Sequence, residues 1–327
     1  MGKPVVLCAP ASLKGVLDAT QAADAIASGV REAGAAPIVA PVADGGEGTA
    51  AVLQTVLGGE WRAATVADPL GRPHEARFLL LPDRTVVVEA AAAIGLPLLE
   101  ADERDPLRAT SDGFGDLMLA ALATRPQRLL VCVGGTATVD GGRGLRRVVG
   151  TALDRYDVQV ACDVTNPLLG ANGAARVYGP QKGASAQIVD ELETLLAEDP
   201  VLRPYAGLPG AGSGGGLGAA LAALGGRLVA GANLVLDLIG FGNALRNADL
   251  CITGEGCVDD TTFSGKAPAL VAARAEREGV GCIVFGGLVV TQRADATIVA
   301  LSGDPTRAAG DLVRLGRSWK DHLGAPG

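Results

Sequence analysis

The chain has 327 residues, of which 48% are hydrophobic and 20% are charged, and its net charge at pH 7 is −8. This composition excludes a disordered chain, and the length is enough for two domains. The acidic balance, without a visible basic cluster, argues against nucleic acid or an anionic membrane surface as a partner. No apolar run reaches the ~18–20 residues that span a bilayer, and the first residues do not resemble a signal peptide.

The positions of the cysteines and histidines argue against disulfides or a zinc site and against a histidine-based site. Five of the six cysteines lie in or beside apolar strand-like runs, and no two have C-x-x-C spacing. Buried free thiols in a reducing cytosol fit this pattern better than disulfides or zinc, so we expect a cytoplasmic protein. His74 and His322 are far apart in the chain, which argues against a histidine-based metal site or triad. The cysteines are Cys8, Cys132, Cys162, Cys251, Cys257 and Cys282.

The first segment predicts the start of a parallel α/β unit. Residues 4–9 are a continuous apolar run typical of a strand buried on both faces, and a helical pattern follows from about Thr20. Residues 37–40 form the next strand-like run. Lys14 lies just past the first strand, on the side where open α/β sheets bind ligands. The alternative for Lys14 is an ordinary solvated surface lysine.

The stretch VADGGEGT, residues 42–49, joins that second strand to a helical run. Its glycines, including Gly45 and Gly46, allow close backbone approach and leave N–H groups at a helix start, where an anion is favoured. Asp44 and Glu47 beside such a site suggest a metal ion or a proton to move. An ordinary tight turn with Asp44 and Glu47 as caps is the alternative.

A second turn of this kind follows hairpin-like runs over residues 61–89 and a buried strand at residues 129–133. The turn GGTATVDGGRG contains two glycine pairs, two threonines and an aspartate, and it is not a P-loop. We predict that these residues bind a nucleotide's phosphates, with Asp140 as a catalytic carboxylate. The candidates are Gly134, Gly135, Thr136, Thr138, Asp140, Gly141 and Gly142.

The next segments add four weaker candidates, Asp163, Lys182, Gly214 and Gly215. A strand-like run at residues 158–163 ends in Asp163, and the loop at residues 178–183 carries Lys182, which we expect to be exposed to a ligand. The glycine-dense residues 209–218 supply Gly214 and Gly215. Gly210, Gly212 and Gly215 have G-x-G-x-x-G spacing, but without a convincing strand before them this is a weak dinucleotide signal.

A third strand, at residues 248–253, runs into the turn GEGCVDDTTFSGKAP, residues 254–268. This turn contains Glu255 and, at a helix start, Lys266. Glycine turns, lysines and carboxylates together are the parts of a phosphoryl-transfer site. We predict Lys14, Asp44, Asp140, Glu255 and Lys266 as catalytic, and Asp44, Glu47, Asp163 and Glu255 as metal-binding; the general base stays open.

The motifs also resemble the bacterial glycerate kinase family over nearly the whole chain and in the right order. They are APASLK (9–14), ADGGEGT (43–49), DPLGRP (68–73), TSDGFG (110–115), VGGTATVDGG (133–142), CDVTNPLLG (162–170), YGPQKGA (178–184), PGAGSGGGLGA (209–219) and ITGEGCVDDTTFSGKAP (252–268). The resemblance implies phosphorylation of D-glycerate with ATP and Mg²⁺, mostly to 2-phosphoglycerate. It also implies two α/β domains with a cleft between them.

The resemblance places both chain ends in one domain. We predict a discontinuous Rossmann-like α/β domain at residues 1–67 plus 264–327 and an inserted α/β domain at residues 68–263. Nothing in the sequence fixes the oligomeric state, and a homodimer is one alternative.

The chain departs from the family pattern at four positions, and residues 145–158 form a much shorter segment than is usual. Asp, Asn and Arg are usual where this chain has Ala11, Val139 and Cys257, and His is common at Ser264. A larger, less polar acceptor pocket or weakened catalysis would follow. A non-catalytic relative that binds a nucleotide or hydroxy acid is therefore one alternative, and a nicotinamide-dependent dehydrogenase is another. The acceptor acid and the attacked hydroxyl stay open.

Overall fold

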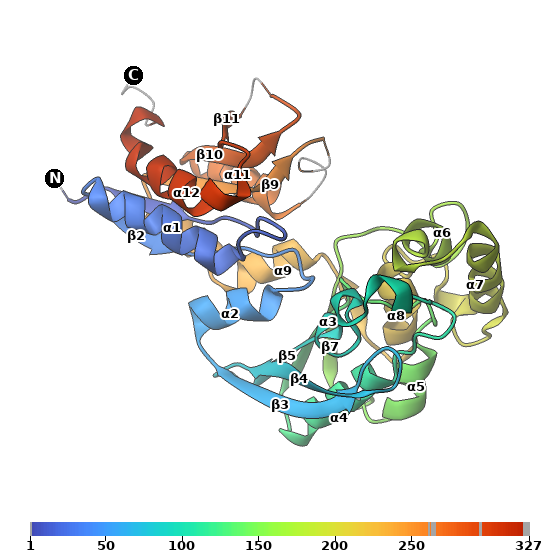
Figure 1. Cartoon of the computed structure of the whole chain (residues 1–327). Helices are drawn as coiled ribbons and strands as arrows, with labels where there is room; N and C mark the ends of the chain where they lie inside the picture. The colour runs from blue at the N-terminus through green and yellow to red at the C-terminus, as the bar shows by residue number, and fades with distance from the viewer. Residues whose placement is uncertain (1, 261, 263–265, 294–295, 323–327) are drawn as a thin grey trace. The chain divides into compact units, whose positions relative to one another are not determined.

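The computed structural model describes residues 2–260, 262, 266–293 and 296–322. They divide into two compact units. The terminal unit consists of Met1–Asp44, Ala51–Leu57 and Ala232–Gly327, and the inserted unit consists of Gly45–Ala50 and Gly58–Gly231. The predicted α/β class, with a parallel doubly wound unit built from both chain ends, is confirmed (Figure 1).

The terminal unit contains a five-stranded sheet in the order β11-β10-β9-β1-β2, with every neighbouring pair parallel. Its strands are β1 (Val5–Cys8), β2 (Ala36–Val39), β9 (Leu250–Val258), β10 (Gly281–Val289) and β11 (Thr297–Ala300). The order reverses between β1 and β9. Right-handed crossovers therefore leave the sheet in opposite directions there, which opens a space beyond the carboxyl ends of these two strands.

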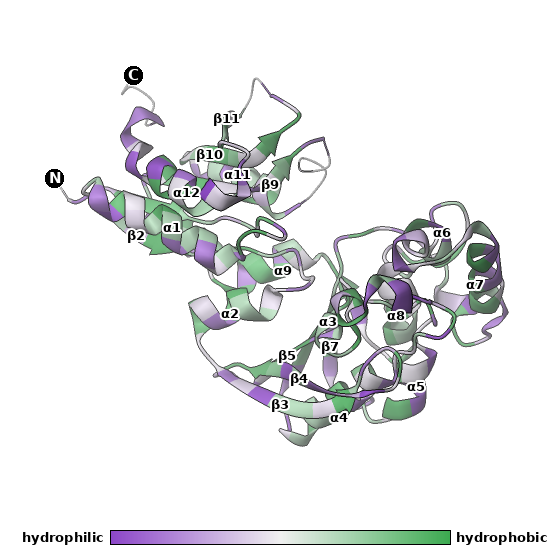
Figure 2. Ribbon diagram, viewed as in Figure 1, coloured by the Kyte–Doolittle hydropathy of each residue, from purple (hydrophilic) through white to green (hydrophobic). Residues whose placement is uncertain are grey.

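Helices on the terminal sheet bury apolar faces. The N-cap Asp18 and Gln21 form a capping box at the start of α1. Ile26 of α1 and Leu312 of α12 lie in one core with Ile252 of β9. Figure 1 shows α1 and α12 side by side, and in Figure 2 both carry hydrophilic and hydrophobic residues. The helices are α1 (Ala19–Glu32), α2 (Thr49–Leu57), α9 (Gly231–Leu238), α10 (Phe241–Arg246), α11 (Ala267–Glu278), η5 (Pro305–Arg307), α12 (Ala308–Arg317) and η6 (Trp319–His322).

The inserted unit contains a six-stranded mixed sheet in the order β3-β4-β5-β6-β7-β8. The first three strands are antiparallel neighbours, as the hairpin pattern predicted, and β5 to β8 are parallel. The strands are β3 (Glu60–Ala67), β4 (Pro73–Leu80), β5 (Thr85–Glu89), β6 (Arg128–Cys132), β7 (Asp157–Ala161) and β8 (Arg227–Val229). The helices are α3 (Ala90–Ile94), η1 (Leu96–Leu98), η2 (Ala101–Glu103), α4 (Asp112–Ala123), α5 (Arg143–Val149), α6 (Ala174–Tyr178), η3 (Pro180–Lys182), α7 (Ala186–Glu198), η4 (Arg203–Tyr205) and α8 (Ser213–Ala223).

The boundary between the units differs from the predicted residues 67 and 264. The chain first crosses between the units near Asp44, and it returns at Ala232. The physical reason for the second difference is β9, because its pairing with β1 aligns Leu250 with Val6 and makes it a central strand of the terminal sheet. Among the described residues, no helix is long and apolar enough to cross a membrane.

Candidate active site

The terminal unit has a cavity of about 480 Å³ at the carboxyl ends of its parallel strands. It lies at the switch point between β1 and β9, where open α/β sheets bind ligands. Its wall contains three predicted residues, Lys14, Glu255 and Lys266. The full lining is Ser12, Leu13, Lys14, Val16, Glu255, Gly256, Cys257, Asp259, Lys266, Gly287, Leu288, Leu301, Gly303, Asp304, Pro305, Ala308 and Asp311.

Backbone hydrogen bonds hold the turn that presents Lys14. Ala11 N donates to Gly254 O at 2.9 Å, which ties the exit of β1 to β9. Leu13 N donates to Leu17 O at 2.9 Å, which closes the turn around the exposed Lys14. The lysine therefore projects from a fixed backbone at the edge of the cavity.

The stretch after residue 253 was predicted as a turn, but β9 continues through it to Val258. Residues 254–258 pair with Phe285–Val289 of β10, with Glu255 opposite Gly286. Glycine is needed at 254, because a Cβ there would lie 2.1 Å from Phe285 O. Close pairing with β10 thus carries Glu255 on a rigid strand, and this long-range contact has no local sequence signal.

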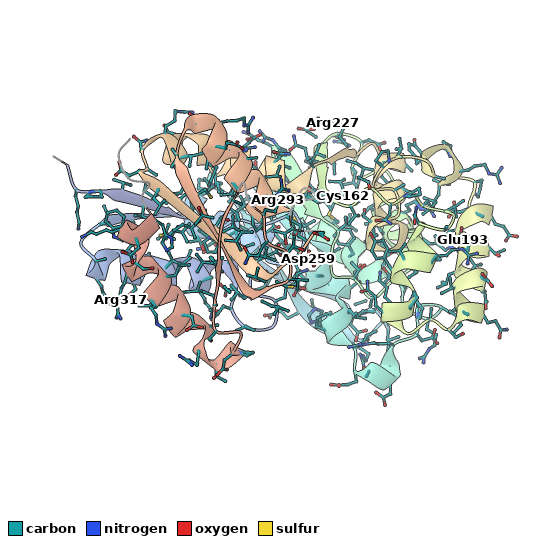
Figure 3. The ribbon with its side chains drawn as sticks, turned by 90° about the horizontal axis from the view of Figure 1, so that it is seen from above. Cys162, Glu193, Arg227, Asp259, Arg293 and Arg317 are labelled. Atoms are coloured by element: carbon teal, nitrogen blue, oxygen red, sulfur yellow. The ribbon has the colours of Figure 1, made fainter. Side chains whose placement is uncertain are left out.

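Glu255 and Lys266 form the charged part of the cavity. Lys266 Nζ lies 3.6 Å from Glu255 Oε2 and 3.8 Å from Oδ1 of Asp259, which Figure 3 labels. The other oxygen, Glu255 Oε1, is buried and has no hydrogen-bond partner among the residues that the structure describes. A buried carboxylate oxygen without a donor is costly, so this atom is suited to receive a ligand, a proton or a cation.

Asp44 lies at the same carboxyl edge of the terminal sheet. The chain after β2 runs beside the end of β1, because Ala40 N donates to Cys8 O and Val42 N to Pro10 O, both at 2.9 Å. Asp44 is exposed two residues further on. Its predicted role in catalysis or metal binding stays a prediction.

In the inserted unit, residues 45–50 lie over the carboxyl ends of β5, β6 and β7. A Cβ at Gly45 would be 2.6 Å from Cβ of Ala161, and a Cβ at Gly134 would be 3.2 Å from Cα of Gly46. Glycines at these positions therefore let two backbones approach closely. A Cβ added at Gly135 would lie 3.1 Å from Oε2 of the exposed Glu47.

Glu89 holds this turn and was missed by the sequence analysis. Its Oε1 accepts a hydrogen bond from Ala50 N at 2.7 Å, so Glu89 caps the start of α2 from the end of β5. Burial raises the pKa of Glu89, and hydrogen bonds from the backbone of Ala50 and Gly48 oppose the shift. The signal that could have revealed it is a single charge at the end of the apolar strand TVVVE.

The half-buried Asp140 accepts four hydrogen bonds from its own unit. Its Oδ2 accepts from Ser111 N (3.0 Å), Ser111 Oγ (2.7 Å) and Gly144 N (3.1 Å), and its Oδ1 accepts from Gly142 N (2.9 Å). Such a carboxylate fixes the entrance to α5. The geometry favours this capping role over a catalytic one.

Lys182 is buried, whereas it was expected to be exposed. Only 3% of Lys182 is accessible, and its Nζ donates to Thr138 O at 2.7 Å and to Thr136 Oγ1 at 3.2 Å. Burial lowers the pKa of Lys182 to about 7, and the charge of Asp140 partly opposes this. Lys182 thus stabilises the loop after β6 through these hydrogen bonds. The predicted Thr136 and Thr138 are buried beside it.

The remaining predicted glycines of the inserted unit are used in packing. A Cβ at Gly215 would lie 1.9 Å from Thr138 O, and one at Gly214 would lie 2.7 Å from Val133 O. A Cβ at Gly142 would lie 2.4 Å from Cβ of Ala220, and one at Gly141 would meet Leu202. The G-x-G-x-x-G match follows η4, a short helix, and not a strand.

The predicted metal ligands are divided between the two units, and their role in metal binding stays a prediction. Asp163 and Glu47 are exposed in the inserted unit, whereas Asp44 and Glu255 belong to the terminal unit. Among the described residues there is no group of three or more His, Cys, Asp or Glu side chains that could hold a metal ion.

The positions at which this chain departs from the family pattern lie in different surroundings. Cys257 lines the cavity. Ala11 lies beside the cavity, where its backbone N–H donates to Gly254 O. Val139 is only 1% exposed, within an apolar cluster that includes Leu168 and Leu192. The prediction that Val139 enlarges a polar acceptor pocket is therefore wrong, because an apolar core surrounds it. Ser264 lies outside the described residues.

A parallel doubly wound sheet with a ligand-sized cavity at its switch point defines an α/β ligand-binding protein. The family model for the glycerate kinase family matches residues 6–155 and 149–302. A glycerate kinase from Halalkalibacterium halodurans is 38% identical over 322 residues, covering 86% of this chain and 85% of the relative. The glycerate 2-kinase of Escherichia coli K12 is 38% identical over 312 residues, covering 83% and 82%.

A solved structure agrees with these relatives. It is the crystal structure of a Salmonella typhimurium LT2 protein with the provisional name glycerate kinase 2, with a TM-score of 0.87, 32% identity and coverage of 98% of both chains. The chain belongs to the glycerate kinase family, and it is a kinase.

The comparisons also bear on the segment near residues 145–158. The H. halodurans match has 322 aligned positions, but 86% of 327 residues is about 281, so about 40 positions of the relative have no counterpart here. The two parts of the family match meet at residues 149–155. The division of the family match agrees with a shortened segment there. In the structure α5 ends at Val149 and β7 begins at Asp157.

Proposed function

We propose that this chain transfers the terminal phosphoryl group of ATP to a hydroxyl of D-glycerate and forms 2-phosphoglycerate. The family membership supports the reaction class, and the E. coli relative is named a glycerate 2-kinase. The observation that carries the proposal is the convergence of Lys14, Glu255 and Lys266 on one cavity at the switch point. Phosphoryl transfer depends on positioning and on charge stabilisation more than on covalent chemistry, and this cluster supplies both.

The two lysines would share the negative charge of the substrates. Lys14 comes from the exit of β1 and Lys266 from the start of α11, so each is fixed by a different backbone. One ammonium would hold phosphate oxygens and the other the carboxylate of the acceptor acid. Charge-assisted hydrogen bonds of this kind are about twice as strong as neutral ones. Asp44 and Glu255 remain the carboxylates proposed for catalysis in this unit.

The residues present fit a magnesium ion that arrives with the nucleotide. Mg²⁺ usually takes one or two protein carboxylates, several waters and the substrate phosphates, so a cluster of three carboxylates is not required. Glu255 fits because no described residue donates a hydrogen bond to its buried Oε1. When bound, the ion would neutralise phosphate charge. Glu255 would hold it on one side, while Lys266 balances the charge of the other oxygen at 3.6 Å.

The test is a coupled ADP-release assay with ATP and Mg²⁺ across small hydroxy acids, including both enantiomers of glycerate, glycolate and lactate. We expect D-glycerate to give the highest kcat/KM, and ³¹P NMR of the product to show phosphate on the 2-hydroxyl. Transfer to the 3-hydroxyl would correct the product only. A protein that binds ADP but turns over none of these acids would be the non-catalytic relative, and the proposal would fall.

A further inference from the structure

The cavity extends well beyond the residues that the sequence predicted. Its charged part lies at the exits of β1 and β9, and its outer half is formed by the end of β10 and the junction between β11 and α12. The outer half presents four apolar side chains, Leu288, Leu301, Pro305 and Ala308. No sequence motif singled out this region.

The two carboxylates of the outer half are already committed to the protein. Asp304 accepts hydrogen bonds from Thr306 N at 2.9 Å and Thr306 Oγ1 at 2.7 Å. Asp311 accepts from Ser302 N at 3.0 Å and from Ser302 Oγ. Its other oxygen, Oδ1, is buried without a hydrogen bond from the described residues, but it forms an ion pair with Nη2 of Arg314 at 3.3 Å. These bonds lower the pKa of both carboxyl groups. They shape the loop, and the apolar side chains remain as the surface offered to a ligand.

The cavity therefore has a charged end, which contains the two lysines, and an apolar end, arranged along the edge of the sheet. Its lining residues come from β9 and β10 and from the segments that follow β1 and β11, and these four strands are adjacent in the order β1, β9, β10 and β11. Three strand spacings of about 4.8 Å give a span of roughly 14 Å. A three-carbon acid is polar throughout and too short to reach both ends. The volume of about 480 Å³ lies in the range of sites for larger ligands.

We propose that the outer half binds the base of the nucleotide donor, with its phosphates directed toward Lys14 and Lys266. This inference rests on the proposed function, since it assumes a nucleotide as the phosphoryl donor. A heteroaromatic base covers the apolar surface of Leu288, Leu301, Pro305 and Ala308. The phosphate chain then runs along the carboxyl ends of β10 and β9 to the two lysines. The ligand is thus a nucleoside di- or triphosphate that lies within the terminal unit.

Two exposed residues at the end of β10 offer a matched test. Leu288 is 58% exposed and lines the cavity, whereas the neighbouring Val290 is 65% exposed and does not. Because both are exposed, Leu288→Ser and Val290→Ser should fold like the parent. Binding is measured by calorimetry with ADP and with inorganic tripolyphosphate, without any acceptor acid. Loss of an apolar contact predicts that Leu288→Ser weakens ADP binding ~10-fold.

The same variant should bind tripolyphosphate like the parent, because the phosphates lie at the other end of the cavity. Val290→Ser should leave both affinities unchanged, and Lys14→Met should weaken both. Equal ADP affinity in the parent and Leu288→Ser overturns the base site. A Leu288→Ser variant that loses D-glycerate affinity and keeps ADP affinity also overturns it, because the cavity is then the acceptor site.

The outcome separates this inference from the proposed function. If ADP binding depends on Leu288 but D-glycerate is never phosphorylated, the base site stands and the proposed reaction fails. If ATP phosphorylates D-glycerate while Leu288→Ser changes neither ADP affinity nor the KM for ATP, the reaction stands and the base site fails.

Discussion

The two units use the same sequence texture, a strand followed by glycines and a carboxylate, for opposite purposes. In the inserted unit, Asp140 accepts four hydrogen bonds, three from the backbone N–H groups of Ser111, Gly142 and Gly144 and one from the Ser111 hydroxyl. In the terminal unit, Glu255 lines a cavity, and one of its oxygens is buried without a donor from the described part of the chain. The spacing of glycine and acid does not separate the two cases.

The difference lies in what the glycines allow to approach. Around Asp140 they admit the protein's own backbone, as Gly215 does against Thr138. Around Glu255, Gly254 admits β10, and the cavity remains open on the other side. A glycine–carboxylate turn therefore indicates close approach, and only the tertiary structure decides whether protein or ligand fills the space.

The largest effect is expected from removing charge at the terminal cavity. Lys266→Met should lower kcat/KM for ATP-dependent phosphorylation ~10²-fold or more, the scale of a lost charge-assisted contact in the transition state. Steady-state kinetics with the best hydroxy acid measure it, and Lys14→Met should act in the same direction. Lys3→Met removes an exposed lysine outside the cavity and serves as the control. Parent-like kinetics in both cavity variants would remove these lysines from the site.

A crossed pair of substitutions tests the comparison directly. Asp140→Ala should lower the free energy of unfolding by ~2–3 kcal/mol, because it leaves the Ser111 hydroxyl and backbone N–H groups without an acceptor. Its folded fraction should keep near-normal turnover. Glu255→Ala should lower turnover and leave the free energy of unfolding almost unchanged, since no hydrogen bond from a described residue is lost at Oε1. Urea unfolding and kcat are measured for both. Equal losses of turnover in the two variants would contradict the division between the units.

The family departures allow a smaller test of the same contrast. Val139→Asn places an amide in the apolar cluster of the inserted unit and should cost ~2 kcal/mol of stability without a gain in activity. Cys257→Arg adds a cation to the cavity wall and should raise kcat/KM for D-glycerate ~10-fold, the scale of one hydrogen bond to a charged group. Thermal melting measures the stability of both variants, and steady-state kinetics measure their activity. If Val139→Asn raises activity and Cys257→Arg does not, the assignment of the two positions is reversed.

Local patterns predicted much of the fold. The apolar run at residues 129–133 corresponds to β6 (Arg128–Cys132), and the Pro/Gly-punctuated runs correspond to the antiparallel strands β3 and β4. Such patterns work because burial and turn chemistry are written in neighbouring residues. The terminal cavity could be anticipated in part, since Lys14 and Lys266 follow strands of a parallel sheet.

What local patterns could not give depends on distant partners. The continuation of β9 through Gly254 requires β10, and the burial of Lys182 requires the loop containing Thr138. The outer half of the cavity comes from the β11–α12 junction, where Asp304 and Asp311 appear acidic in sequence but are used internally. The sequence alone does not show whether a charged side chain will be bonded within the folded protein or left to a ligand.

The smallest expected effect is a pH dependence of stability caused by Lys182, whose side chain is buried in the inserted unit. Its pKa is about 7 in the folded protein, against 10.5 for an ordinary lysine, because burial disfavours the charged form. Between these two values the unfolded chain holds a proton that the folded protein has released, so stability rises with pH. The cost of burying the ammonium is fully present below pH 7 and is progressively removed above it. The stability of the parent minus that of Lys182→Met should therefore rise by about 1 kcal/mol between pH 7 and 8. Urea unfolding of both proteins at each pH measures this difference. A difference that stays constant, or that falls as pH rises, would mean that Lys182 keeps its proton in the folded state and that its charge remains in the loop after β6.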